Sequence, residues 1–251
     1  MSGHSKWSQI KRQKGANDAK RGAVFTKVGR EISIAARVGG ADPDGNYRLR
    51  LAIDKARAVN MPADNIKRAV ERATGGSAAD QFEEVIYEGY GPGGVAILVE
   101  AATDNRNRTA ADVRAVFTRG GGQLAGTGSV AWQFEPRGVI AIARDGLDPD
   151  DVALTAIDAG ADDVDTDADD MIEVLTDPGQ LEALRKSLES AGISVESAEV
   201  TMQPTQRIEV DTDAVRQNLR LLEQLEDLDD VQRVSANFDL PADVLAEVAG
   251  A

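Results

Sequence analysis

Residues 138–202 read GVIAIARDGLDPDDVALTAIDAGADDVDTDADDMIEVLTDPGQLEALRKSLESAGISVESAEVTM, and no other segment has such regular secondary-structure signals. Short runs of β-branched residues predict strands, and apolar residues at helical spacing predict helices. We expect strands at 139–143, 162–164, 171–176 and 195–202, and helices at 150–159 and 181–191. This βαββαβ order is typical of the split-βαβ, or ferredoxin-like, arrangement. The segment therefore predicts a small α/β domain at 135–204.

Two incomplete sets of elements flank this segment. Before it, we expect strands at 84–90, 95–102 and 129–134 with a helix at 108–118. After it, the tail 207–240 predicts a strand, a helix at 214–226 and a strand at 231–238. One helix and two strands can hardly bury a core alone. We therefore expect residues 79–134 and 205–240 to combine into one discontinuous middle domain, into which 135–204 is inserted.

The N-terminal part of the chain has a helical pattern. Residues 1–17 are polar and basic without an apolar period, which indicates an arm. Helices are expected at 18–38 and 47–59, and a third from Pro62, which suits a first turn, to Gly75. We predict a helical domain at 1–78. The fold class is thus α+β, with an N-terminal three-helix domain followed by two α/β (ferredoxin-like) domains, the middle one discontinuous.

Charge is distributed unevenly along the chain. The formal net charge of the 251 residues is −15. Residues 1–76, however, carry sixteen Lys and Arg against seven Asp and Glu, while the remainder carries twelve against 36. A basic segment joined to an acidic body is typical of a nucleic-acid-binding protein, although a solvated charged surface without a partner is the plainer alternative.

Composition argues against catalysis and against metal or cofactor binding. The chain has no Cys and a single His, His4, which excludes thiolate zinc sites and multi-His sites. The Asp-rich run 162–170 lacks the Gly and Glu of a calcium loop, and Gly120–Gly122 is not followed by Gly-Lys-Ser/Thr. No stretch is long and apolar enough for a membrane span, and the N-terminus does not resemble a secretory signal. We expect a cytoplasmic, non-enzymatic protein.

The candidate nucleic-acid-binding residues lie in the arm and on the first two helices. Basic side chains would contact phosphates, which gives affinity and salt sensitivity but no choice of base sequence. Trp7 would either stack on a base or pack on the helices. The candidates are Lys6, Trp7, Lys11, Arg12, Lys14, Lys20, Arg21, Lys27, Arg30, Arg37, Arg48 and Arg50.

The chain also resembles the YebC family along almost its whole length. The resemblance is carried by GHSKW at 3–7, IKRQKGANDAKRG at 10–22, FTKVGREISIAARVGG at 25–40, NYRLRLAIDKARAVNMPADNIKRAVERATGG at 46–76 and YEGYGPGGVAILVEAATDNRNRTAADVR at 87–114. It implies a three-domain cytoplasmic protein without known catalysis. Most family members are described as DNA-binding transcriptional regulators, and some, including mitochondrial relatives, as ribosome-associated translation activators.

Two functions thus fit the sequence. The first is a DNA-binding transcriptional regulator that acts through the basic helical domain, and the alternative is a ribosome-associated translation factor that contacts rRNA with the same surface. The acidic α/β domains would then provide protein contacts or self-association. A hydrolase or metal-dependent enzyme hidden among the carboxylates is a third hypothesis, which no nucleophile or His constellation supports.

Overall fold

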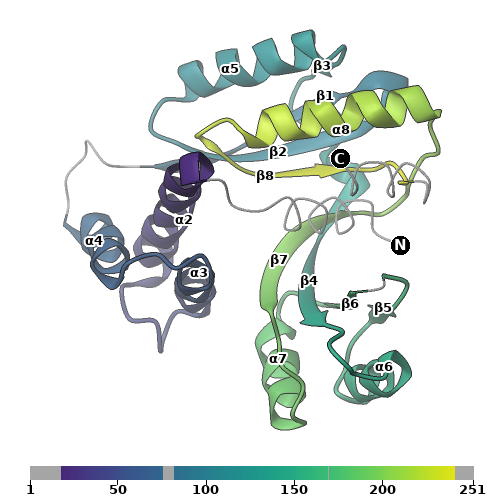
Figure 1. The fold of residues 1–251 in the computed structure, drawn as a ribbon. Coiled ribbons are helices and arrows are strands. Elements are labelled where there is room, and N and C mark those ends of the chain that lie inside the picture. Colours follow the sequence, from purple (N-terminus) through teal and green to yellow (C-terminus); the bar gives the residue numbers. More distant parts are fainter. Residues whose placement is uncertain (1–17, 76–81, 169, 241–251) are drawn as a thin grey trace. The chain divides into compact units, whose positions relative to one another are not determined.

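The computed structural model describes residues 18–75, 82–168 and 170–240. The described chain divides into two compact units, one made of residues 134–203 and the other of residues before 134 and after 203. The second unit contains the N-terminal helices together with the first sheet (Figure 1). None of the helices in the described part of the chain combines the length and apolarity that a bilayer crossing requires.

Three helices open the described chain: α2 (Asp18–Gly39), α3 (Tyr47–Ala58) and α4 (Ala63–Thr74). Asn46 joins the first two. Its side chain accepts a hydrogen bond from the Leu49 amide at the start of α3 and donates to the carbonyls of Ala35 and Gly40 at the end of α2. One residue thereby satisfies groups at two helix ends.

The helices enclose their own apolar core. α2 contributes Val28, Ile32, Ala35 and Ala36, and α3 contributes Leu49, Ala52, Ile53 and Ala56. Met61, beside Pro62, is buried in the same cluster. The predicted positions of the three helices are confirmed within one or two residues at their ends.

The first sheet has the strand order β3-β1-β2-β8. Its strands are β1 (Glu83–Tyr90), β2 (Ala96–Thr103), β3 (Gln123–Leu124) and β8 (Val231–Ala236). β1 pairs antiparallel with β2 and β3, and β2 pairs antiparallel with β8, so strands from before and after residues 134–203 share one sheet. A short 3-10 turn at Pro92–Gly94 joins β1 to β2.

Two helices, α5 (Arg106–Arg119) and α8 (Thr212–Glu226), lie side by side on one face of this sheet (Figure 1). Phe117 of α5 and Leu221 of α8 are fully buried in the core between helices and sheet, together with Ile97 and Val99 of β2. The tail of the chain therefore completes the core that residues 82–124 begin.

The unit of residues 134–203 has a second sheet of order β5-β6-β4-β7. Its strands are β4 (Phe134–Ala143), β5 (Asp163–Asp165), β6 (Met171–Thr176) and β7 (Ser197–Pro204), and its helices are α6 (Pro149–Asp158) and α7 (Leu181–Ser190). β6 pairs antiparallel with both β4 and β5. The elements follow the predicted βαββαβ order, and the α+β fold class is confirmed.

Two predicted strands are wrong. Residues 129–134 do not form one strand: a 3-10 turn occupies Ala131–Gln133, and β4 begins at Phe134. The amides of Gly128, Val130 and Ala131 donate to the Glu88 carboxylate and so are not available for a strand ladder. The strand predicted at the start of the tail is reduced to a single parallel bridge between Ile208 and Phe238.

Candidate nucleic-acid interface

The predicted binding residues fall into three groups. Those of the arm, Lys6, Trp7, Lys11, Arg12 and Lys14, lie outside the described residues. Lys20 and Arg21 lie near the start of α2, where the structure describes the backbone alone. The side chains of the other five, Lys27, Arg30, Arg37, Arg48 and Arg50, are described, and most of them contact other parts of their own unit.

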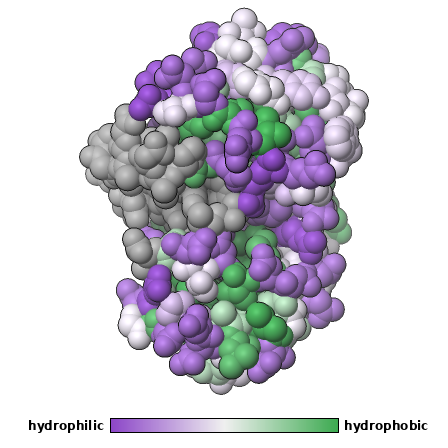
Figure 2. All heavy atoms as spheres, turned by 90° about the vertical axis from the view of Figure 1, so that its right-hand side faces the viewer, coloured by the Kyte–Doolittle hydropathy of each residue, from purple (hydrophilic) through white to green (hydrophobic). Residues whose placement is uncertain are grey.

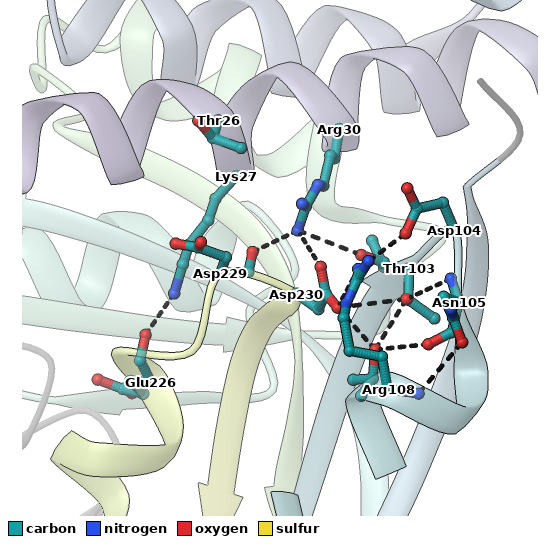
Figure 3. Close-up of polar contacts among 12 residues, drawn as sticks. Thr26, Lys27, Arg30, Thr103, Asp104, Asn105, Arg108, Glu226, Asp229 and Asp230 are labelled. Atoms are coloured by element: carbon teal, nitrogen blue, oxygen red, sulfur yellow. Dashed lines mark hydrogen bonds and ion pairs between the residues drawn. The ribbon is translucent and has the colours of Figure 1, made fainter. Parts of the chain in front are cut away.

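Three of these side chains project from one side of α2 toward the sheet of the same unit. Lys27 Nζ donates to the Glu226 carbonyl, Arg30 Nη1 to the Asp229 carbonyl and Arg37 Nη2 to the Phe82 carbonyl. Figure 3 shows Lys27 and Arg30 pointing from α2 to these acceptors. The Arg30 guanidinium also lies 5.1 Å from the centroid of the Phe82 ring, within cation–π range.

The acceptor of Lys27 is the end of a helix. Glu226 is the last residue of α8, and the last carbonyls of a helix have no partner within it. They also form the negative end of the helix dipole, which favours a cation. The Lys27 ammonium therefore docks α2 onto the C-terminus of α8.

A buried carboxylate, Asp230, anchors the same side of α2. Its two oxygens contact Arg30 Nη1 at 2.8 Å and Arg108 Nη2 at 2.7 Å. The Thr109 hydroxyl donates to it at 2.6 Å and the Thr103 hydroxyl at 3.3 Å. Figure 3 shows Arg30 of α2, Thr103 of β2 and Arg108 of α5 converging on Asp230, the residue before β8.

Charged and polar partners dominate the electrostatics of Asp230. Burial alone would raise its pKa, but the hydrogen bonds from Thr109 and Arg108 and the charges of Arg30 and Arg108 outweigh burial and lower the pKa below its ordinary value. Asp230 therefore stays ionised and holds both guanidinium groups. The cluster fixes the orientation of α2 against the sheet.

Nothing in the sequence pattern reveals this cluster. Asp230 closes the run Asp227–Asp230, which looks like a solvated acidic turn, and Arg108 lies in the polar stretch before the predicted helix 108–118. Only the pairing of β8 with β2 brings Asp230 next to Thr103 and Ala102. The acidic run at 227–230 is the sequence feature nearest to this cluster, but the sequence does not show which cations lie opposite it.

Two exposed arginines of α3, Arg48 and Arg57, are less constrained. Arg48 pairs with Glu84 of β1, and both side chains are about half exposed, so the pair contributes little to stability. The Arg50 guanidinium lies 5.7 Å from the Tyr47 ring. Arg57, further along α3, is exposed and pairs with Asp54 one turn away in the same helix. The guanidinium groups of Arg48 and Arg57 can turn toward an external anion at little cost.

α4 presents further exposed cations. Lys67 pairs with Glu71, and Arg68 bonds to the Asp64 carbonyl and the Asn65 side chain, all within the same helix. Arg72, in the last turn, makes no hydrogen bond or ion pair with any residue that the structure describes. Among the described residues, no three His, Cys, Asp or Glu side chains are grouped so that they could hold a metal ion.

A second buried carboxylate, Glu88, organises the loop that precedes β4. Its oxygens accept hydrogen bonds from the amides of Gly128 at 2.6 Å, Val130 at 2.7 Å and Ala131 at 2.8 Å. Burial would raise the pKa of Glu88, but these backbone donors outweigh burial and lower it. The exposed Trp132 follows this loop and donates to the Ser129 carbonyl at 3.1 Å.

Known proteins match this chain along its whole length. Residues 5–76 match the model of the TACO1/YebC protein N-terminal domain, and residues 82–238 match that of the TACO1/YebC second and third domain. A probable transcriptional regulatory protein of Rubrobacter xylanophilus is 52% identical over 251 residues, which is 100% of each chain. One of Roseiflexus castenholzii is 55% identical over 249 residues, 97% of each chain.

A solved structure is also similar. The crystal structure of a conserved hypothetical protein from Aquifex aeolicus superimposes with a TM-score of 0.84 at 44% sequence identity, covering 89% of this chain and 92% of that one. That protein is described only as hypothetical, so this likeness supports the fold.

Proposed function

Because the chain belongs to the TACO1/YebC family, we propose that it is a DNA-binding transcriptional regulator that contacts DNA through its basic N-terminal helical domain. Its relatives bear the name probable transcriptional regulatory protein. The proposed role is binding in the cytoplasm, without a catalytic step.

The observation that carries this proposal is the concentration of positive charge in the helical segment. Residues 1–76 hold sixteen of the 28 Lys and Arg of the chain. On the described helices α3 and α4, Arg57, Lys67 and Arg68 have polar partners within their own helix, and Arg72 has none among the described residues. Such cations can exchange an intrahelical partner for a phosphate, which releases counterions and favours association.

We propose different roles for different candidate residues. Lys27 and Arg30 would reach a phosphate only by giving up the contacts of Figure 3, so we assign them to positioning α2. Besides the exposed cations of α3 and α4 named above, the phosphate contacts are assigned to candidates whose side chains lie outside the described residues or have weaker partners. These are Lys6, Lys11, Arg12, Lys14, Lys20, Arg21, Arg48 and Arg50. Arg37 would lie at the edge of the surface that these residues form, and Trp7 would stack on a base.

A second candidate function is a ribosome-associated translation factor. The described cations are compatible with it, because Lys and Arg side chains bind phosphates and such contacts do not by themselves select a base sequence. A surface of this kind binds rRNA as readily as duplex DNA. The same residues would serve in either case.

The proposal is tested by crosslinking the protein in growing cells and sequencing the DNA and the RNA recovered with it. A DNA-binding regulator gives discrete enriched DNA sites upstream of genes. Uniform DNA background together with enriched rRNA would reject the first function in favour of the second.

A further inference from the structure

Helix α6 in the unit of residues 134–203 exposes two large apolar side chains. It buries Val152 and Ala156 against its own unit, while Leu154 is 62% and Ile157 56% exposed. Scattered exposed apolar residues are ordinary on protein surfaces. These two are three residues apart on one helix, so they lie next to each other on the same face.

Three carboxylates share this face with the apolar pair. At 100° per residue, Asp150, Asp151 and Asp158 lie within the same arc as Leu154 and Ile157, opposite the buried side of α6. The face therefore consists of an apolar centre bordered by negative charge. Figure 2 shows apolar green residues bordered by hydrophilic purple ones on the surface of this unit, toward the bottom of the view.

No cation of this unit neutralises the face. Residues 134–203 carry eighteen Asp and Glu against four Lys and Arg. Each of the four cations contacts another group: Arg137 pairs with Glu135 and Asp162, Arg144 donates to the Ala168 carbonyl, Arg185 pairs with Glu189, and Lys186 pairs with Glu182. Within the described part of the unit, the three carboxylates of the α6 face have no cationic partner.

We propose that this α6 face, Asp150, Asp151, Leu154, Ile157 and Asp158, is a docking surface for a basic amphipathic segment of another protein. Like-charge repulsion disfavours nucleic acid, an anionic lipid surface and the α6 face of a second copy alike. A segment with Lys or Arg around two or more large apolar side chains matches both the charge and the apolar centre. This inference goes beyond the proposed DNA-binding function and does not depend on it.

The test uses the full-length protein and a labelled synthetic helix of Leu and Lys only, arranged with one apolar face. An isomeric peptide of the same composition without an apolar face is the first control. Affinities are measured by fluorescence anisotropy. We expect the amphipathic peptide to bind more tightly than its isomer. The double variant Leu154→Gln, Ile157→Gln should weaken binding of the amphipathic peptide by about tenfold or more, because the complex then buries less apolar surface.

Charge is tested by a matched pair of triple variants. Asp150→Asn, Asp151→Asn and Asp158→Asn should weaken binding markedly, whereas Asp163→Asn, Asp167→Asn and Glu196→Gln, which change the net charge equally within the same unit, should weaken it less. Conservative Leu154→Met with Ile157→Met should retain the affinity.

Three results would overturn the proposal. The first is that the two peptides bind with equal affinity. The second is that the Leu154→Gln, Ile157→Gln variant binds the amphipathic peptide as tightly as the wild type does. The third is that the wild type self-associates and this variant does not. The last result would assign the face to a second copy of the chain. Thermal unfolding followed by circular dichroism confirms that each variant folds, as expected for substitutions at exposed positions.

Discussion

Arg30 of α2 and Asp230 before β8 form an ion pair of 2.8 Å in which both side chains are largely buried, at 13% and 8% exposure. The pair joins the helical segment to the sheet that the tail of the chain completes. Removing one partner of a buried pair leaves the other charge without compensation, which is far more costly than losing a surface pair.

Asp230→Asn tests the role of this carboxylate. The substitution keeps the shape of the side chain but leaves Arg30 and Arg108 without their shared counter-charge. We expect a loss of roughly 3–5 kcal/mol in the free energy of unfolding, measured by urea denaturation. Asp229→Asn is the matched control, since Asp229 takes part through its backbone carbonyl and its side chain is exposed. Equal stabilities of the two variants would show that Asp230 does not anchor α2.

Glu88→Gln tests the second buried carboxylate. The amide cannot accept hydrogen bonds from Gly128, Val130 and Ala131 as the carboxylate does, and a hydrogen bond to a charged group contributes about 1.5–3 kcal/mol. We expect a loss of stability of at least that size in the same measurement. Glu84→Gln, on the same face of β1 but exposed and paired with Arg48, should change stability by about 1 kcal/mol or less.

The contribution of Glu88 also depends on pH in a defined direction. Its folded-state pKa is lower than the ordinary value, so its stabilising effect is fully present above the ordinary carboxyl pKa. The effect is lost as pH falls through the lower folded-state pKa. The stability difference between wild type and Glu88→Gln should therefore be constant near neutral pH and shrink in acid. A difference that grows as pH falls would contradict this assignment.

Gly89→Ala tests the close approach of β1 to α5. A Cβ at Gly89 would lie 2.6 Å from the Phe117 ring and 2.8 Å from the Gln123 carbonyl, and both neighbours are held in place by the core or the sheet. Overpacking of this kind costs about 1–3 kcal/mol. Gly126→Ala is the control, because a Cβ there meets nothing within 4 Å. Thermal unfolding of the two variants should differ by several degrees.

Two double variants separate binding from positioning on α2. Lys20→Gln with Arg21→Gln should leave the melting temperature unchanged, weaken binding to every duplex sequence and flatten the plot of log affinity against log salt by about 0.9 per lost phosphate contact. Lys27→Gln with Arg30→Gln should instead lower the melting temperature, because the contacts to Glu226, Asp229 and Asp230 are lost. If the second pair weakens DNA binding at full stability, Lys27 and Arg30 contact phosphate directly.

Local patterns predicted most of the elements. Apolar residues at helical spacing and the Gly39–Gly40 stop placed the first helix at 18–38, and α2 spans Asp18–Gly39. The inserted βαββαβ segment was likewise predictable, because each strand and helix is bounded by its own turn residues. The proposed division into three domains stays a prediction.

The errors arise where distant residues decide the local structure. Residues 129–134 have a strand-like apolar pattern, but Glu88 of β1 binds the amides of that segment and holds it as a loop. The phosphate contacts predicted for the basic face of α2 stay a prediction, but the pairing of β8 with β2 places Asp230 and the end of α8 opposite that face, which the sequence did not show. The spacing of residues along the chain does not show that Glu88 binds the loop before β4, nor that Asp230 lies opposite α2.

The most direct test of the central claim places two targets in competition. The full-length protein is equilibrated at physiological salt with ribosomes and with a genomic duplex DNA library, and the bound fractions are separated by sedimentation and sequenced. The account predicts tight, salt-sensitive binding to a discrete set of promoter fragments and no sedimentation with ribosomes. Association with ribosomes, with only weak and sequence-indifferent DNA binding, would contradict it.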